Sequence, residues 1–217
     1  MLVIPSINES VFSEIAAKIK KAEAFLPSDG WIHLDVSDGV FTPYTSWRTP
    51  EDMAGFSTRL NIEAHLMAQE PEAALGSWIA ALRSVTGGAR RIIVHVEAMT
   101  DPAYILESCA QANMQAGLAL KPLTPPDLTL VYLRDFQFVQ ILAVEPGPSG
   151  QQFNETVLSK IRFFKERAPG VIIEVDGGMN PETALRVKSA GADAVVSGAY
   201  IWEAPLPKLA YEELTKI

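Results

Sequence analysis

The chain has 217 residues, of which 48% are hydrophobic and 20% are charged, as in an ordinary globular protein. Its formal net charge of −8 opposes general binding to nucleic acid or to an anionic membrane surface, so neither is expected as a partner. The single cysteine, Cys109, excludes an intrachain disulfide and suits a reducing compartment. The first residues, MLVIPSINES, lack the pattern of a secretion signal, and no apolar run is long enough to span a bilayer, so we expect a cytoplasmic protein.

Short apolar segments alternate with helical patterns along the chain. The first, Leu2–Ile4, is closed by Pro5, and the helical pattern that follows from Val11 to Phe25 could be capped by Asn8 or Ser10. The other expected strands are Trp31–Val36, Leu60–Leu66, Arg91–Val96, Ala116–Leu120, Phe138–Val144, Val171–Val175 and Ala194–Ser197. Helices are expected between them, among others at Glu72–Arg83, Pro102–Asn113, Glu155–Arg167 and Pro181–Ala190.

This alternation predicts parallel strands joined by crossover helices. A total of eight strands favours closure into a (β/α)8 TIM barrel over an open sheet. The strands are apolar on both faces except at their C-terminal ends, as expected when helices cover one side and a packed interior the other. Because no linker or charge run divides the chain, we expect residues 1–217 to form one α/β domain.

Histidine and acidic residues gather at the C-terminal ends of these strands, where barrel enzymes build their sites. In WIHLDVSDGVFTP, His33 and Asp35 are two residues apart in a strand and therefore share a face. EAHLM contributes His65, and IIEVDGG contributes Asp176. Each residue alone could be a polar group satisfied by the backbone. Together, two imidazoles and two carboxylates would suit a divalent metal such as zinc, manganese, cobalt or ferrous iron.

Glycine-rich loops follow the last three strands, in EPGPSGQ, VDGGMN and VVSGAY. Glycine is an ordinary turn residue, but barrels also bind phosphate through backbone N–H groups after strands seven and eight. A metal and a phosphate site together suggest a phosphorylated substrate whose carbonyl and hydroxyl oxygens chelate the cation. Such a cation would acidify the intervening C–H and stabilise an enediolate. Asp35 and Asp176, on distant strands of a closed ring, could then move the proton on opposite faces of the ligand.

The chain resembles the ribulose-phosphate 3-epimerase family along nearly its whole length. The matching stretches, in the family's order and spacing, are IPSI, HLDVSDGVFTP, AHLM, VHVEA, GLALKPLTP, VEPGPSGQ, EVDGGMN and AGADAVVSGAYIW. The resemblance implies a single-domain barrel of the ribulose-phosphate-binding type. It also implies an isomerase of the pentose phosphate pathway that interconverts D-ribulose 5-phosphate and D-xylulose 5-phosphate by a two-aspartate proton shuttle. One divalent metal ion per subunit is implied, zinc first and iron, manganese or cobalt as alternatives, together with a homo-oligomer.

The same resemblance assigns roles to residues of this sequence. The implied metal ligands are His33, Asp35, His65 and Asp176, and the implied acid/base pair is Asp35 and Asp176. His95 is expected outside the direct metal ligands, as a pair with Glu97 that is either structural or supports those ligands from behind. The implied substrate contacts are Ser6, His65, Met67, Gly147, Gly150, Gly177, Gly178, Gly198 and Ala199.

Several positions depart from the family pattern. Ser37 and Leu142 stand where the family has methionine, and Lys121 and Glu145 stand where it has asparagine. The phosphate loop reads PGPSG instead of PGFGG, and Ala199 replaces a serine. TPY replaces VPN in a loop that also carries Tyr44, Trp47 and Arg48. One interpretation is drift, in which Lys121 could pair with Glu145. The other is a changed substrate, such as allulose 6-phosphate.

Two further functions remain as alternatives. Related sugar-phosphate and orotidylate decarboxylases carry D-x-K-x-x-D on a strand, but Ser37 occupies the lysine position here. A barrel that binds metal and sugar phosphate without catalysis would fit the altered phosphate loop and the thinner methionine wall. Solvent deuterium that appears at C3 of a ketose phosphate would separate catalysis from this last alternative.

Overall fold

The computed structural model describes residues 1–85 and 87–217. Within these residues, eight strands form a closed barrel, in which each strand pairs in parallel with the next and β8 pairs with β1. The strands are β1 (Leu2–Ile7), β2 (Trp31–Ser37), β3 (Asn61–Met67), β4 (Arg90–His95), β5 (Gln115–Leu120), β6 (Phe138–Leu142), β7 (Ile172–Asp176) and β8 (Ala194–Ser197). The predicted (β/α)8 TIM barrel is therefore confirmed.

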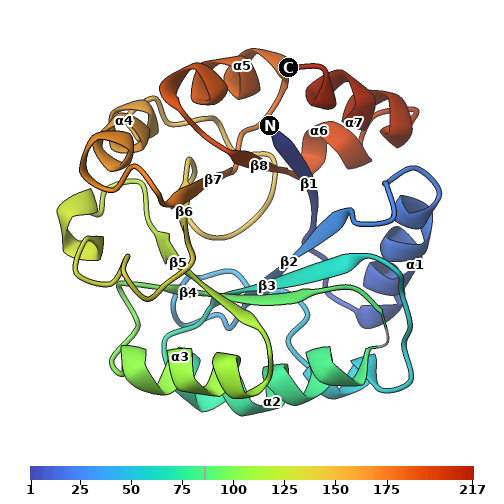
Figure 1. Cartoon of the computed structure of the whole chain (residues 1–217). Helices are drawn as coiled ribbons and strands as arrows, with labels where there is room; N and C mark the ends of the chain where they lie inside the picture. The colour runs from blue at the N-terminus through green and yellow to red at the C-terminus, as the bar shows by residue number, and fades with distance from the viewer. Residues whose placement is uncertain (86) are drawn as a thin grey trace.

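Helices surround this ring of strands (Figure 1). They are α1 (Phe12–Glu23), α2 (Pro71–Ser84), α3 (Pro102–Gln111), α4 (Val157–Arg167), α5 (Pro181–Ala190), α6 (Ala199–Trp202) and α7 (Pro207–Thr215), with 3-10 helices η1 (Pro50–Met53) and η2 (Pro126–Thr129). Each long helix buries one face; on α1, Ile15 and Ile19 are four residues apart and both buried. The largest hydrophobic cluster accordingly joins buried side chains of the helices to those of the strands.

The first strand continues beyond the predicted end at Ile4. Pro5 pairs with Ser197 of β8, and the strand runs on to Ile7. A residue in a parallel strand directs its N–H to one neighbour only, so a single proline costs one ladder hydrogen bond. The extension places Ser6 inside the barrel mouth instead of in a loop.

Capping of α1 by Asn8 or Ser10 was a wrong prediction. The N-cap residue is Val11, and it makes no side-chain cap hydrogen bond. Asn8 instead donates from Nδ2 to the carbonyl oxygen of Gly147, 3.0 Å away. Its amide is therefore used in a tertiary contact across the barrel mouth, which local sequence rules for helix ends do not anticipate.

The barrel interior is more polar than predicted. Small apolar clusters fill part of it, including Ile93 and Phe138. However, Glu63 on β3, Gln140 on β6 and Glu174 on β7 are also buried, well before the C-terminal ends of their strands. The expectation that only the strand ends carry polar residues was therefore wrong.

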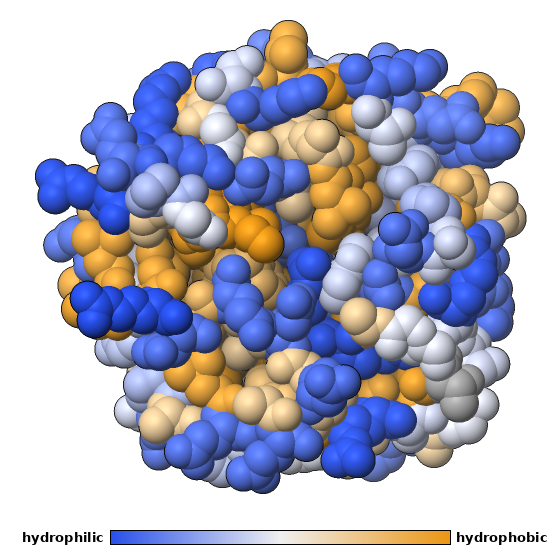
Figure 2. All heavy atoms as spheres, in the orientation of Figure 1, coloured by the Kyte–Doolittle hydropathy of each residue, from blue (hydrophilic) through white to orange (hydrophobic). Residues whose placement is uncertain are grey.

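The described part of the chain, residues 1–85 and 87–217, has no helix long and apolar enough to cross a membrane. Figure 2 shows one face of the molecule, on which hydrophilic residues are interspersed with hydrophobic ones. Such a mixture is usual for a protein surface, because polar side chains alone cannot cover a globular fold.

Candidate metal centre and active site

Four side chains from three strands meet at the C-terminal end of the barrel. β2 carries His33 and Asp35, β3 carries His65, and β7 carries Asp176. His33 Nε2 lies 3.2 Å from Asp35 Oδ1 and 4.0 Å from Asp176 Oδ2. His65 Nδ1 lies 3.3 Å from Asp35 Oδ1 and 3.8 Å from Asp176 Oδ2. The four residues singled out in the sequence thus surround one point.

The spacing and chemistry of these donor atoms suit a divalent cation. The four atoms lie within 4.8 Å of one another, and the two imidazole nitrogens are 3.3 Å apart. Ligand atoms about 2.1 Å from a tetrahedral zinc ion would be about 3.4 Å from one another. Two nitrogens and two carboxylate oxygens would also suit iron, manganese or cobalt. The residues present therefore fit the metal that the sequence motifs imply.

The two aspartates differ in acidity because their surroundings differ. Burial, together with the neighbouring Asp35 carboxylate, raises the pKa of Asp176 to about 7. Burial also acts to raise the pKa of Asp35, but the charge and hydrogen bond of His33, together with the neighbouring imidazole of His65, outweigh it and hold that pKa well below its usual range. The pair therefore combines one ionised carboxylate with one that can carry a proton near neutral pH.

Each of the two imidazoles has another partner on the side away from the central point. His33 Nδ1 lies 2.8 Å from Glu63 Oε1. His65 Nε2 lies 2.9 Å from His95 Nε2, and His95 Nδ1 lies 3.0 Å from Glu97 Oε2. His95 and Glu97 are thus outside the group of four but linked to it through His65.

A second group of potential ligands, formed by His33, Glu63 and Glu174, lies deeper in the barrel. Here Arg91 Nη1 is 3.0 Å from Glu63 Oε2 and 3.7 Å from Glu174 Oε2. The same guanidinium lies over the Trp31 ring, 3.7 Å from its centroid. Because Arg91 already supplies a cation to these buried carboxylates, we interpret the group as a charge-balanced floor and not as a second metal site.

A pocket opens above the four central side chains. Asp35 and Asp176 line it, and so do eight of the predicted substrate contacts: Ser6, Met67, Gly147, Gly150, Gly177, Gly178, Gly198 and Ala199. His65, the ninth, is fully buried and is not among the lining residues. Its ring lies among His33, Asp35 and His95, so its contact with a substrate stays a prediction.

Glycine is needed at particular points of this pocket wall. A Cβ atom on Gly198 would lie 2.6 Å from Ser6 Oγ, so the Ser6 hydroxyl would have to move. Gly177 and Gly178 have φ values of +100° and +68°, which favour glycine. Backbone N–H groups can therefore approach a ligand closely between β7, β8 and the end of β1, as in barrels that bind phosphate.

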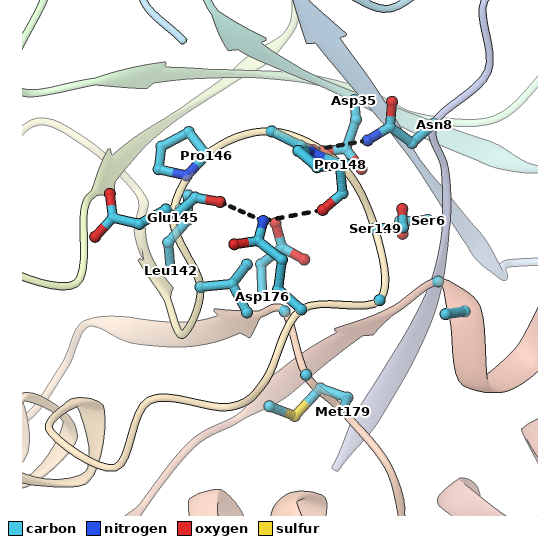
Figure 3. Close-up of a pocket in the computed structure, with 18 of the residues that line it drawn as sticks. Ser6, Asn8, Asp35, Leu142, Glu145, Pro146, Pro148, Ser149, Asp176 and Met179 are labelled. Carbon is cyan, nitrogen blue, oxygen red and sulfur yellow. Dashed lines mark hydrogen bonds between the residues drawn. The ribbon is translucent and has the colours of Figure 1, made fainter. Parts of the chain in front are cut away.

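The loop between β6 and α4, residues 143–156, borders the same pocket and is tied down at several points. Thr42 Oγ1 donates to the carbonyl oxygen of Pro146 at 2.6 Å, and Asn8 donates to that of Gly147. Gln151 Nε2 donates to the carbonyl oxygens of Glu145 and Pro148. Figure 3 shows the hydrogen bond of Asn8 and those that end at Glu145 and Pro148, and in this view Asp176 lies within the arc of the loop. The contacts of Thr42 and Asn8 hold the loop against the barrel mouth, and those of Gln151 lie within the loop.

The departures from the family pattern have identifiable surroundings. Lys121 Nζ lies over the Phe41 ring, 3.7 Å from its centroid, and the ion pairs among the described residues include none between Lys121 and Glu145. Ser37 is buried, with its hydroxyl 3.7 Å from Met67 Sδ. The apolar part of the pocket wall is formed by Met67, Leu142, Val144 and Met179.

Several residues of the site were not singled out in the sequence. These residues are Glu63, Glu174 and Met179. The hydrogen bonds that Asn8 and Thr42 make to the β6–α4 loop were not predicted either. The sequence does contain a pattern that indicates the positions of Glu63 and Glu174. The strands carry polar pairs two residues apart, H-x-D, E-x-H, H-x-E and E-x-D, and this spacing directs both members of each pair to one face. The contacts of Asn8 and Thr42 join distant segments and have no local signal.

Proteins of one known family resemble this chain along most of its length. The model of the ribulose-phosphate 3 epimerase family matches residues 2–202. A ribulose-phosphate 3-epimerase of Mycobacterium leprae is 30% identical over 217 residues, covering 98% of this chain and 94% of the relative. One from Synechocystis is 35% identical over 212 residues, covering 94% of this chain and 89% of the relative.

Solved structures resemble the chain in fold. A crystal structure of 3-hexulose-6-phosphate synthase matches with a TM-score of 0.68 at 20% identity, covering 100% of this chain and 99% of the other. Orotidine 5'-phosphate decarboxylase from Pyrococcus horikoshii matches with a TM-score of 0.63 at 16% identity, covering 100% of both chains. Fold similarity at such low identity does not carry function.

Proposed function

The chain belongs to the ribulose-phosphate 3-epimerase family, and on that premise we propose that it inverts C3 of a ketose phosphate, D-ribulose 5-phosphate to D-xylulose 5-phosphate, with one divalent metal ion. Family membership makes the protein an enzyme, an epimerase of sugar phosphates. The observation that carries the finer proposal is the meeting of two imidazoles and two carboxylates at one point on the floor of a glycine-lined pocket.

In the proposed reaction, Asp35 and Asp176 exchange protons with opposite faces of C3. The ionised Asp35 removes the C3 proton, and Asp176 in its protonated form delivers a proton from the other side. The roles reverse in the opposite direction. A bound divalent ion would supply positive charge beside the ketose oxygens and so lower the pKa of the C3–H bond. His33 and His65 would hold that ion through Nε2 and Nδ1.

The wall formed by Ser6, Gly177, Gly178, Gly198 and Ala199 is proposed to bind the substrate phosphate. These residues share one side of the pocket with Ser149 of the β6–α4 loop. Hydroxyl and backbone N–H donors suit a phosphate group in a chain whose net charge is negative, because they supply local positive potential without a cationic side chain.

Thr42→Val is expected to raise KM for the ketose phosphate about fivefold with little change in kcat. The substitution keeps the side-chain shape but removes the hydrogen bond to Pro146, and one such bond contributes about 1 kcal/mol to holding the β6–α4 loop in place. Steady-state kinetics of the variant measure both constants. Thr215→Val, which makes the same change on α7, is the control; an unchanged KM in Thr42→Val would show that this tie does not help to bind substrate.

The identity of the ketose is tested by comparing substrates. D-ribulose 5-phosphate and D-allulose 6-phosphate are incubated separately with protein whose metal content has been measured by elemental analysis, and the products are identified by NMR. The proposal expects kcat/KM to be higher for the pentulose and lost after chelation. A preference for the hexulose would assign the altered mouth, including Lys121 over Phe41, to a changed substrate.

A non-catalytic barrel is the second candidate, and the altered phosphate loop PGPSG is the observation that favours it. Such a protein would bind metal and sugar phosphate without product formation in the same experiment.

Assembly into a homo-oligomer and residence in the cytoplasm are further parts of the proposal, to be measured by light scattering and by fractionation.

A further inference from the structure

A row of three side chains, two buried imidazoles and a more exposed carboxylate, leads away from the central point to the β5 side of the barrel. His65 Nδ1 faces Asp35, while His65 Nε2 lies 2.9 Å from His95 Nε2. His95 Nδ1 in turn lies 3.0 Å from Glu97 Oε2. Both imidazoles are fully buried, so their ring nitrogens have no alternative partners in solvent. The position of each proton in this row of side chains therefore depends on the group at its outer end, Glu97.

The end group, Glu97, is surrounded by donors. Its Oε1 accepts from the backbone N–H of Lys121 at 2.7 Å and from the hydroxyl of Thr124. These hydrogen bonds and the one from His95 favour the ionised carboxylate, which can only accept hydrogen bonds. The contact between Glu97 and His95 therefore requires a proton on His95 Nδ1.

The remaining proton positions follow in sequence. A neutral imidazole with its proton on Nδ1 presents a lone pair at Nε2, so His95 Nε2 must accept. The proton between the two rings then belongs to His65 Nε2. His65 Nδ1 is left with a lone pair, directed at the point shared with His33 and Asp35, where it can accept a hydrogen bond from His33 Nε2, 3.3 Å away. A metal ion binds a histidine through such a lone pair.

We propose that Glu97, acting through His95, is a positioning residue that fixes the tautomer of His65 so that its Nδ1 is free to bind the metal. This inference rests on the metal site of the proposed function and deepens it. His33 has the simpler arrangement, in which Glu63 Oε1 lies directly against Nδ1 and leaves Nε2 facing the centre. For His65 the carboxylate lies one imidazole further away, because His95 occupies the intervening space.

The substitution Glu97→Gln tests the direction in which the hydrogen bonds among Glu97, His95 and His65 run. The glutamine oxygen is expected to face the N–H of Lys121, which leaves the amide NH2 facing His95 Nδ1. His95 would then carry its proton on Nε2, and His65 would carry its proton on Nδ1, toward Asp35. Because the metal must displace that proton, we expect the affinity for zinc to fall about 10- to 100-fold.

The matched control is Glu72→Gln. Glu72 Oε1 accepts from the backbone N–H groups of Thr100 and Asp101, so it orders the same connection between β4 and α3 without touching a histidine. The variant makes the same chemical change and should keep the zinc affinity of the unaltered protein within about twofold. Thermal unfolding of all three proteins shows whether each remains folded.

Two measurements are made on the full-length chain: zinc affinity by competition with a chelator, and the imidazole tautomers of the metal-free protein by ¹⁵N NMR. The chain has only three histidines, so each ring can be assigned by substitution. We expect the unaltered protein to show His65 protonated on Nε2 and Glu97→Gln to show it protonated on Nδ1. An unaltered protein with His65 protonated on Nδ1 would overturn the proposal, even if Glu97→Gln failed to fold.

An unchanged zinc affinity in Glu97→Gln, or an equal loss in Glu72→Gln, would also overturn the proposal. None of these readouts requires turnover. A protein that binds zinc with the expected tautomers but epimerises no ketose phosphate would contradict the proposed reaction and leave the role of Glu97 intact.

Discussion

Asp176→Asn is expected to abolish proton exchange at C3 of the ketose phosphate, with kcat falling by about 10⁴-fold. Asparagine is close to aspartate in size, but its amide cannot take up or release a proton. The loss should be large because, of the carboxylates that line the pocket in the described part of the chain, Asp35 and Asp176 belong to the central group, whereas Glu145 lies on the β6–α4 loop. The variant is assayed for epimerisation and for deuterium uptake.

Asp29→Asn serves as the control for this substitution, since Asp29 is exposed and precedes β2 at the opposite end of the barrel. The control should retain full activity. Asp176→Asn should unfold no more easily than the unaltered protein, because removing one of two adjacent buried carboxylates relieves the repulsion that raises the pKa of Asp176. An Asp176→Asn variant that is folded and still exchanges C3 protons would remove Asp176 from the mechanism.

The second large effect is expected from His65→Asn, which should lose the metal ion. The substitution removes Nδ1, one of four donor atoms within 4.8 Å of one another, and leaves three ligands for the cation. His95→Asn should be milder, because His95 touches the group only through His65. Elemental analysis of both variants, purified in parallel without added metal, gives the metal content per chain.

The comparison of these two histidines is informative because their surroundings are alike. Both rings are fully buried, and they stack with their centroids 5.0 Å apart. A general effect of removing a buried imidazole would therefore be similar for both. Equal loss of metal from His65→Asn and His95→Asn would show that the ligand set has been assigned wrongly.

Much of this fold could be predicted because its parallel strands are short, apolar and regularly spaced. The α5 helix, Pro181–Ala190, has the predicted bounds, and Asn180 caps it with hydrogen bonds to the N–H groups of Glu182 and Thr183. The four central residues could also be found, since the C-terminal ends of parallel strands meet at one mouth. Residues such as His33 and His65, distant in sequence, are thereby brought together by topology alone.

The parts that could not be predicted depend on contacts between segments that share no local pattern. Asn8 is followed by a helix and has the chemistry of a cap, but its amide bonds to Gly147, 139 residues away. Charged residues in mid-strand, such as Glu63, become stable only beside Arg91 of the neighbouring strand. The pKa of Asp176, likewise, reflects its burial beside Asp35 rather than its own sequence neighbours.

Incorporation of deuterium from D2O at C3 of D-ribulose 5-phosphate, followed by ¹H NMR, tests the central claim most directly. The protein with its metal bound is expected to replace the C3 hydrogen by deuterium as D-xylulose 5-phosphate forms, and to lose this activity on chelation. Product that retains the original C3 hydrogen, or exchange that persists at full rate without metal, would contradict the account.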